Sequence, residues 1–170
     1  MAADTMADKR SDAATGGYNP NTVSATAGID YGRVAVGGVA AAVVMIVIGV
    51  LGNKFVFGQR MQAEMAAAAP TLPRTPSTTA IVAAIATQVI VGLMLVWLYA
   101  AMRPRFGAGP GTAAKAAAVV WIFGFLFYQD WLHVGLMTGT TYAIVSVVQA
   151  ISVLAGALAG ARLYGENPRT

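Results

Sequence analysis

Long apolar runs alternate with short polar stretches along this chain. The first run is unbroken from about Val34 to Leu51, and three more cover about residues 80–102, 113–134 and 141–164. Each can cross the hydrocarbon core of a bilayer, which takes roughly 17 to 25 helical residues. The runs are continuous and rich in alanine, whereas strands of a membrane barrel alternate over about ten residues. The pattern therefore predicts an all-α membrane protein, with residues 31–164 forming a four-transmembrane-helix bundle of two hairpins.

The polar stretches between and beside these runs predict tails and loops. Residues 1–30 are small and polar, which is typical of a disordered tail, and residues 165–170 form a second, short tail. The segment QRMQAEMAAAA predicts about two helical turns, which the following prolines, Pro70, Pro73 and Pro76, bring to an end.

The stretch RPRFGAGPGT, residues 103–112, predicts a tight turn between the second and third spans. Its two prolines and three glycines break regular structure, so we expect neither a helix nor a strand to run through it. Thr112 stands just before an alanine-rich run, and we expect its hydroxyl to cap the free amides of the next helix.

Composition supports the membrane class and excludes several kinds of site. Of the residues, 57% are hydrophobic and 11% are charged, whereas about a quarter would be charged in a soluble domain. There is no cysteine, which excludes disulfides, thiolate metal sites and cysteine nucleophiles. The net charge of +4 sits at the span ends rather than on a basic face with interleaved aromatic residues. We therefore expect anionic lipid headgroups, and not nucleic acid, as its partner.

The basic residues also predict the orientation of the bundle. With the N-terminus inside, eight basic residues face the cytoplasm and three face outward. The inner group is Lys9, Arg10, Arg33, Arg103, Arg105, Lys115, Arg162 and Arg169, and the outer group is Lys54, Arg60 and Arg74. This excess fits the positive-inside rule, so we expect a multi-pass protein of a bacterial inner membrane with both termini cytoplasmic.

Two glutamines, Gln88 and Gln149, lie near the centres of the second and fourth spans. A primary amide in hydrocarbon is unfavourable unless it finds a hydrogen-bond partner. One interpretation is a hydrogen bond between the two amides that holds these spans side by side. The other is a contact with a substrate or pigment at the middle of the membrane.

Asp130 and His133 are three residues apart, so they share a face of a continuing helix near the outer boundary. One histidine and one carboxylate are too few for a closed zinc site, which takes about four ligands, and no metal site is expected. The pair also lacks the nucleophile that a catalytic site would need. The neighbouring Tyr128, Trp131 and Tyr142 favour an ordinary interfacial belt, with His133 as a pigment ligand the less favoured alternative.

Small residues recur at helical spacing and predict close helix packing. They are Gly38 and Ala42 in the first span, and Ser152, Gly156 and Gly160 in the fourth. These faces are suited to packing within the bundle or against a partner. Trp121 lies deep in the third span, where its indole N–H needs an acceptor. Arg103, Arg105 and Lys115 form a cationic ledge that predicts contact with lipid headgroups.

The segments WLYAAMRPRFGAGPGTA, residues 97–113, and ALAGARLY, residues 157–164, resemble a family of small, uncharacterised four-helix bacterial inner-membrane proteins. That family combines a Trp-Leu-Tyr span end with an Arg-Pro-Arg-Phe-Gly turn, and the resemblance covers roughly residues 33–164. It implies a fold and a location. It implies no activity, no cofactor and no catalytic residues.

These observations lead to two expectations of function. The first is a non-catalytic accessory or structural subunit that packs against lipids and other integral membrane subunits, with a respiratory or photosynthetic complex as its host. The second is a small transporter or channel that uses Gln88 and Gln149 at the midplane and Asp130 as an entry group. We expect no enzyme activity and no cofactor.

Overall fold

A computed structural model describes residues 28–71 and 75–165, and every regular element within them is helical. The elements are α2 (Tyr31–Gly52), the π-helical turn η2 (Asn53–Phe57), α3 (Gly58–Ala68), α4 (Thr78–Phe106), α5 (Pro110–His133) and α6 (Gly139–Gly165). The predicted all-α class and the four long apolar helices are confirmed. Most of the two predicted tails, together with Pro73 and Arg74, lies outside the described residues.

The first of the four long helical segments is longer than a membrane requires. Residues 31–68 form one continuous helical segment of 38 residues through α2, η2 and α3. At about 1.5 Å per residue this greatly exceeds the roughly 30 Å hydrocarbon core. The apolar part is α2, whereas α3 carries Gln59, Arg60, Gln62 and Glu64. We therefore treat α2 as the span and α3 as its extension beyond the membrane.

Two of the spans begin at polar caps. The carboxylate of Asp30 accepts a hydrogen bond from the Arg33 amide at 3.1 Å and forms an ion pair with the Arg33 side chain at 3.2 Å. The hydroxyl of Ser77 accepts from the Ala80 amide at 3.2 Å, directly after Pro76 ends the preceding loop. Each cap satisfies an amide that has no partner within its own helix.

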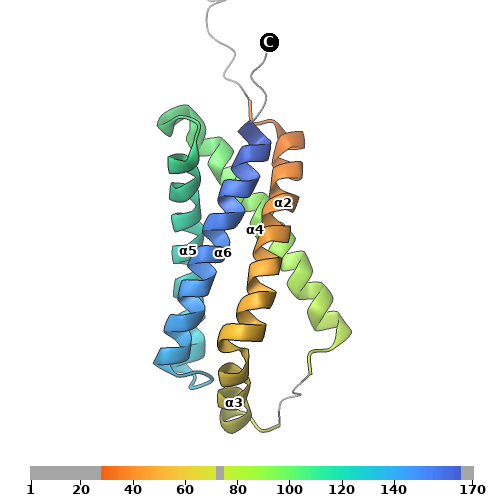
Figure 1. Cartoon of the computed structure of the whole chain (residues 1–170), viewed down its shortest axis with the longest axis vertical. Coiled ribbons are helices and arrows are strands. Elements are labelled where there is room, and N and C mark those ends of the chain that lie inside the picture. Colours follow the sequence, from red (N-terminus) through yellow and green to blue (C-terminus); the bar gives the residue numbers. More distant parts are fainter. Residues whose placement is uncertain (1–27, 72–74, 166–170) are drawn as a thin grey trace, which may run out of the picture.

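The four spans form a bundle in which α2 and α6 lie side by side, α4 crosses behind them, and α5 packs on α6 (Figure 1). The start of α2 meets the end of α6, where the Asp30 amide donates a hydrogen bond to the Tyr164 hydroxyl at 3.3 Å. The turn between α4 and α5 lies at this same end of the bundle, and α3 lies at the other (Figure 1). This arrangement places the two helical hairpins in parallel.

Close approach of α2 to its neighbours depends on small residues. A Cβ on Gly37 would lie 2.8 Å from the carbonyl oxygen of Gly160, and one on Gly38 would lie 2.7 Å from Leu93 Cα. A Cβ on Gly92 would collide with the Gly38 carbonyl oxygen. The backbones of α2, α4 and α6 therefore touch where the sequence placed its small residues, and no larger side chain fits there.

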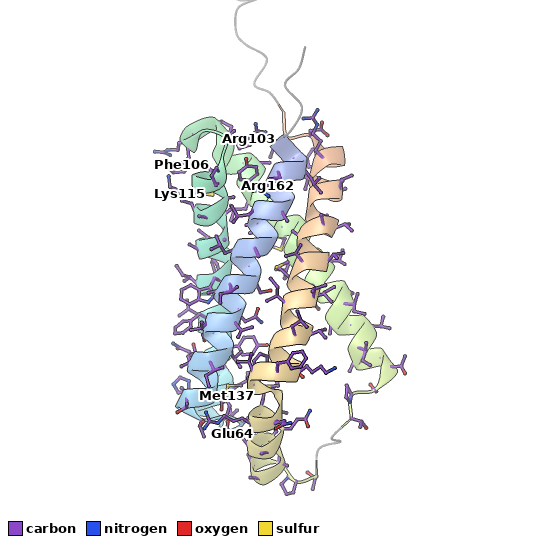
Figure 2. All side chains as sticks on the ribbon, in the orientation of Figure 1. Glu64, Arg103, Phe106, Lys115, Met137 and Arg162 are labelled. Carbon is purple, nitrogen blue, oxygen red and sulfur yellow. The ribbon has the colours of Figure 1, made fainter. Side chains whose placement is uncertain are left out.

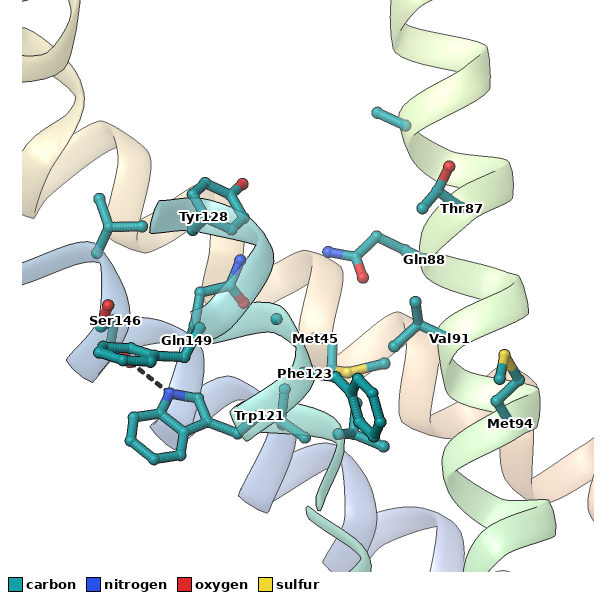
Figure 3. Close-up of a pocket in the computed structure, with 16 residues that line it drawn as sticks. Met45, Thr87, Gln88, Val91, Met94, Trp121, Phe123, Tyr128, Ser146 and Gln149 are labelled. Atoms are coloured by element: carbon teal, nitrogen blue, oxygen red, sulfur yellow. Dashed lines mark hydrogen bonds between the residues drawn. The ribbon is translucent and has the colours of Figure 1, made fainter. Parts of the chain in front are cut away.

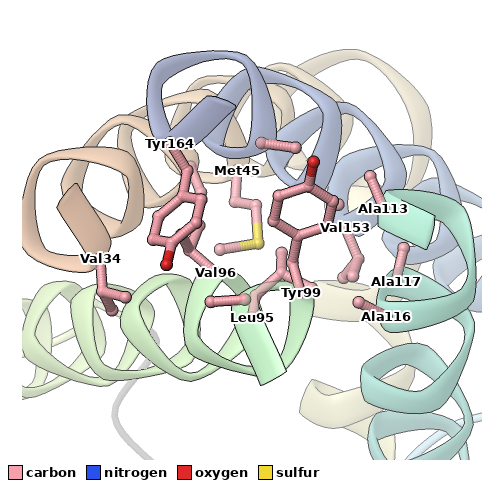
Figure 4. Packing of buried hydrophobic residues seen from close by; sticks show 14 residues of the cluster. Val34, Met45, Leu95, Val96, Tyr99, Ala113, Ala116, Ala117, Val153 and Tyr164 are labelled. Atoms are coloured by element: carbon pink, nitrogen blue, oxygen red, sulfur yellow. The ribbon is translucent and has the colours of Figure 1, made fainter. Parts of the chain in front are cut away.

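The core is concentrated toward the end of the bundle where α2 begins and α6 ends. Val34, Leu95, Val96 and Tyr164 belong to one buried cluster with the alanines of α5 (Figure 4). The rings of Tyr99 and Tyr164 meet edge to face, with centroids 6.0 Å apart. Aromatic edges and faces attract electrostatically in this geometry, which adds to the stability of the packed end.

The turn between α4 and α5 is shorter than the sequence predicts. Helix α4 continues through Pro104 to Phe106, and α5 begins at Pro110, so only residues 107–109 are non-helical. No helix runs through residues 103–112, as predicted, but α4 extends into this stretch and α5 begins within it, so the turn is shorter than the ten residues predicted. Pro104 removes one intrahelical hydrogen bond near the end of α4, and only two helical residues follow it, whereas Pro110 suits a first helical position. The chain reverses at Gly107 and Gly109, whose φ angles are +80° and +139°.

Thr112 caps a different helix from the one expected. Its hydroxyl donates to the carbonyl oxygen of Gly107 at 2.8 Å and to that of Phe106 at 3.3 Å. It therefore satisfies carbonyl groups at the end of α4 rather than amides at the start of α5. The reason is that α5 starts at Pro110, three residues earlier than predicted, which leaves Thr112 inside its first turn and facing back toward the end of α4.

Candidate functional site: a lateral cavity between α4, α5 and α6

A cavity of about 540 Å³ opens on the side of the bundle, between α4 and the α5–α6 pair (Figure 3). Its wall is mostly apolar, with aromatic rings on the α5 side. The lining residues are Met45 from α2; Ala84, Thr87, Gln88, Val91 and Met94 from α4; Val120, Trp121, Phe123, Gly124, Phe125 and Tyr128 from α5; and Val145, Ser146, Gln149 and Val153 from α6.

The path of α4 creates this cavity. Helix α4 touches α2 where Gly92 meets Gly38, and it diverges from the other helices on the N-terminal side of that point (Figure 1). Each residue from 78 to 87 is exposed as a result. We call residues 78–87 the α4 arm. The cavity therefore lies on the N-terminal side of the crossing at Gly92, between the α4 arm and the other helices.

Both midplane glutamines reach this cavity. Gln88 projects into it from α4 and Gln149 from α6 (Figure 3). Within residues 28–71 and 75–165, neither amide makes a hydrogen bond, either to the other or to the backbone. In the same residues no fully buried side-chain nitrogen or oxygen lacks a partner, so both half-buried amides open onto accessible space. The structure brings the two residues to one site without joining them.

Two other polar groups of the cavity wall already have partners. The Thr87 hydroxyl donates to the Ala83 carbonyl at 2.9 Å, and the Trp121 indole N–H donates to the Ser146 carbonyl at 3.0 Å. This gives Trp121 the acceptor that its position in the span requires, and it fixes the indole as a wall of the cavity (Figure 3). The remaining polar side chains of the wall are the amides of Gln88 and Gln149 and the hydroxyls of Ser146 and Tyr128.

No charged side chain is among the described residues that line the cavity. An ion in such a site would lose its hydration without gaining a counter-charge, which is strongly unfavourable in a medium of low dielectric constant. The site therefore suits an uncharged occupant. An apolar wall with a few convergent polar groups is also the usual make-up of a small-molecule site.

Asp130 and His133 lie apart from the cavity, at the exposed end of α5. The Nδ1 atom of His133 is 2.8 Å from the carbonyl oxygen of Gln129 on its own helix. The described residues contain no group of three potential metal ligands. The predicted role of His133 in pigment binding stays a prediction; His133 is an exposed side chain in the last turn of α5.

The cationic ledge is held in place by aromatic rings. The guanidinium of Arg103 lies over Tyr99 and Tyr164, at 5.9 and 5.2 Å from the ring centroids, and the ammonium of Lys115 lies 4.2 Å from the centre of the Phe106 ring (Figure 2). Cation–π contacts of this kind orient a charge while leaving part of it accessible. Arg105 is exposed beside them.

The small residues of α6 face the inside of the bundle. Gly156 packs on Met45, Gly160 packs on Gly37 and Val96, and the Ser152 hydroxyl donates to the Met45 carbonyl at 3.2 Å. Ala42 and Gly38 of α2 meet Gly92 in the same way. These faces are therefore occupied by helices of the same chain.

Glu64 forms a contact between helices that the sequence does not predict. Its carboxylate accepts three hydrogen bonds at the start of α6: from the Thr138 amide at 2.9 Å, the Thr138 hydroxyl at 2.8 Å and the Thr141 hydroxyl at 2.7 Å. Partial desolvation raises the pKa of Glu64. The three hydrogen bonds and the positive charge of Arg60 together lower this pKa by more, so it lies below its usual value. No local motif links Glu64 to residues more than seventy positions away.

Comparison with protein-family models, curated proteins and solved structures finds no match to this chain. The family resemblance inferred from residues 97–113 and 157–164 therefore stays a prediction. The cavity and its two amides are the features from which a function has to be argued.

Proposed function

We propose that this integral membrane protein binds and carries a small, uncharged, lipid-soluble molecule in the cavity between α4, α5 and α6. The observation that carries the proposal is that Gln88 and Gln149 open onto one cavity without hydrogen-bond partners among the described residues. Two unpartnered amides at the level of the hydrocarbon are unfavourable unless an occupant satisfies them. An occupant with a polar group and an apolar body would do so.

The walls favour a carrier over an ion channel. A channel for ions needs a wetted path with polar or charged walls, whereas this cavity is bounded by Val91, Val120 and Phe123 and opens sideways. A sideways opening admits molecules that are already dissolved in the bilayer. No step in such binding needs a catalytic residue, and we propose no enzyme activity.

Charge distribution supports the orientation that we propose for the carrier. Within the described residues, Arg33, Arg103, Arg105, Lys115 and Arg162 gather at the end that holds the α4–α5 turn. Lys54 and Arg60 belong to the opposite end. By the positive-inside rule the first end is cytoplasmic in a bacterial inner membrane, and its ledge of Arg103, Arg105 and Lys115 contacts lipid headgroups.

Filling the cavity tests the proposal. Gly124 lies in the cavity wall, and a Cβ at this position meets no atom within 4 Å, so the side chain of Gly124→Leu begins in open space and adds volume to the wall. Gly49→Leu is the matched control, because Gly49 is equally open but lies outside the cavity wall. Both variants and the wild type are purified from membranes with a gentle detergent, and bound small molecules are extracted and measured by mass spectrometry.

The expected result is a molecule that leaves with the wild type and with Gly49→Leu and is depleted at least several-fold with Gly124→Leu. Equal amounts of every extracted molecule in all three proteins would contradict the proposal.

A second candidate function is an accessory subunit of a larger membrane complex. It is favoured by the α4 arm, which is exposed and carries the small residues Ala80, Ala83, Ala84 and Ala86. Small residues allow another helix to approach closely. A native gel of mildly solubilised membranes tests this candidate: migration of the chain in a band much larger than a dimer supports it, and migration as a monomer or dimer opposes it.

A further inference from the structure

The cavity also indicates which class of molecule it takes. We infer that its ligand has a planar, uncharged ring with two oxygen atoms, as in a quinone or quinol, and an apolar tail. This inference rests on the proposed function and adds the chemistry of the ligand. It follows from three properties of the wall: the position of the amides, the aromatic side chains, and the direction of the opening.

The amides set the polar part of the ligand. Gln88 and Gln149 enter the space from different helices and do not bond to each other, so a single ligand with two polar atoms can satisfy both (Figure 3). A primary amide both donates and accepts hydrogen bonds. It can therefore donate to a carbonyl oxygen and accept from a hydroxyl, which makes the site suitable for the oxidised and the reduced forms of such a ring.

Aromatic side chains set the shape of the apolar part. Trp121 and Phe125 lie with ring centroids 5.5 Å apart on the α5 wall, and Trp121 is held by its bond to Ser146. Fixed aromatic faces favour a flat partner, because rings attract one another in offset or edge-to-face arrangements. A saturated chain would fill the same volume without this contribution.

The opening sets where the tail goes. The cavity is bounded on one side by the diverging α4 arm, whose residues 78–87 are exposed. A tail attached to the ring can leave between the arm and α5 and remain in the bilayer. The lack of charged side chains in the described wall also argues against an acidic or cationic headgroup, as in a phospholipid.

The experiment follows the fluorescence of Trp121, which lies in the wall of the cavity. The other two tryptophans are replaced in a Trp97→Phe, Trp131→Phe background, so that Trp121 is the sole emitter. The protein in lipid nanodiscs is titrated with a benzoquinone that carries a ten-carbon tail, since quinones quench indole fluorescence on contact. The same titration is made with 1-decanol present as a competitor of matching tail length.

We expect saturable quenching that decanol does not displace and that is weakened about tenfold in the Gln88→Leu, Gln149→Leu double variant. Gln62→Leu is the matched control, because Gln62 is exposed on α3 and lies outside the cavity, and it leaves the titration unchanged. Circular dichroism of the double variant verifies that it is folded, and a retained affinity for the quinone in a folded double variant would overturn the inference.

Two outcomes separate this inference from the function on which it rests. If decanol displaces the quinone at equal concentration, the inference that the ligand has a planar ring is wrong, while the proposal that the cavity binds a lipid-soluble molecule is retained. If the quenching is not saturable and Gly124→Leu does not alter it, the cavity binds neither molecule, and both the ligand class and the proposed function fail.

Discussion

The carboxylate of Glu64 on α3 accepts a hydrogen bond of 2.7 Å from the hydroxyl of Thr141 on α6, across 77 positions of sequence. Thr141 is fully buried, and the same carboxylate also accepts from the amide of Thr138 just before α6. A negative charge at the start of a helix is stabilised by the free amides and by the helix dipole. Thr138 itself caps α6, because its hydroxyl accepts from the Thr141 amide at 3.4 Å, and Glu64 from another helix holds this cap by accepting from the Thr138 amide and hydroxyl.

Replacing Glu64 by alanine is expected to lower the stability of the bundle by about 1 to 2 kcal/mol, because the Thr138 amide and the Thr141 hydroxyl lose their acceptor. The estimate is modest because Glu64 is half-exposed, so water replaces part of what is lost. Thermal unfolding in detergent, followed by circular dichroism, measures the change. Gln62→Ala, two residues away on the same helix and exposed, is the control and should unfold like the wild type.

Acid should weaken the same cap. Because the pKa of Glu64 is lowered in the folded protein, its contribution to stability is fully present above the unfolded value of about 4.5 and is lost as the pH falls through the folded value. The difference in unfolding temperature between wild type and Glu64→Ala should therefore be constant from pH 7 to about pH 5 and shrink below it. A difference that persists unchanged at pH 3 would show that the carboxylate charge is not the cause.

The crossing of α2 and α4 should be intolerant of any side chain at Gly92. A Cβ there collides with the Gly38 carbonyl oxygen and lies 2.9 Å from the Ala42 nitrogen, so the two backbones would have to separate. Overpacking in a tight interface costs about 1 to 3 kcal/mol. Gly92→Ala is expected to unfold at a clearly lower temperature than the wild type. Gly49→Ala, which meets nothing within 4 Å, should unfold at the wild-type temperature or above it.

Much of the fold follows from the sequence because hydrophobicity over long windows decides it. The four apolar runs predict the four spans, and the small residues Gly38 and Gly160 lie where helices meet. Local rules were less reliable at the α4–α5 turn. They predict that the second span ends near Met102 and that Thr112 caps the third, whereas α4 continues two residues past Pro104 and α5 already begins at Pro110.

The sequence predicts the polar residues of the candidate site but not their arrangement. Gln88 and Gln149 stand out as amides in apolar runs, but whether they meet each other or face a space depends on the angle at which α4 crosses α2. That angle comes from the contact of Gly92 with Gly38, which periodicity does not encode. Glu64 was invisible for a related reason: its partners, Thr138 and Thr141, become neighbours only after the bundle has formed.

Single cysteines can decide the proposed orientation, because the chain has none of its own. Ala67 lies near the end of α3 and Ala108 in the α4–α5 turn, and both are exposed and at opposite ends of the bundle (Figure 1). By the positive-inside rule, the excess of basic residues around Ala108 predicts that this end of the bundle is cytoplasmic. A membrane-impermeant maleimide should therefore label Ala67→Cys in intact cells with a permeable outer envelope, and Ala108→Cys only after the inner membrane is disrupted. Labelling in the reverse order would mean that the basic residues do not set the topology, and that the ledge of Arg103, Arg105 and Lys115 faces the outer leaflet.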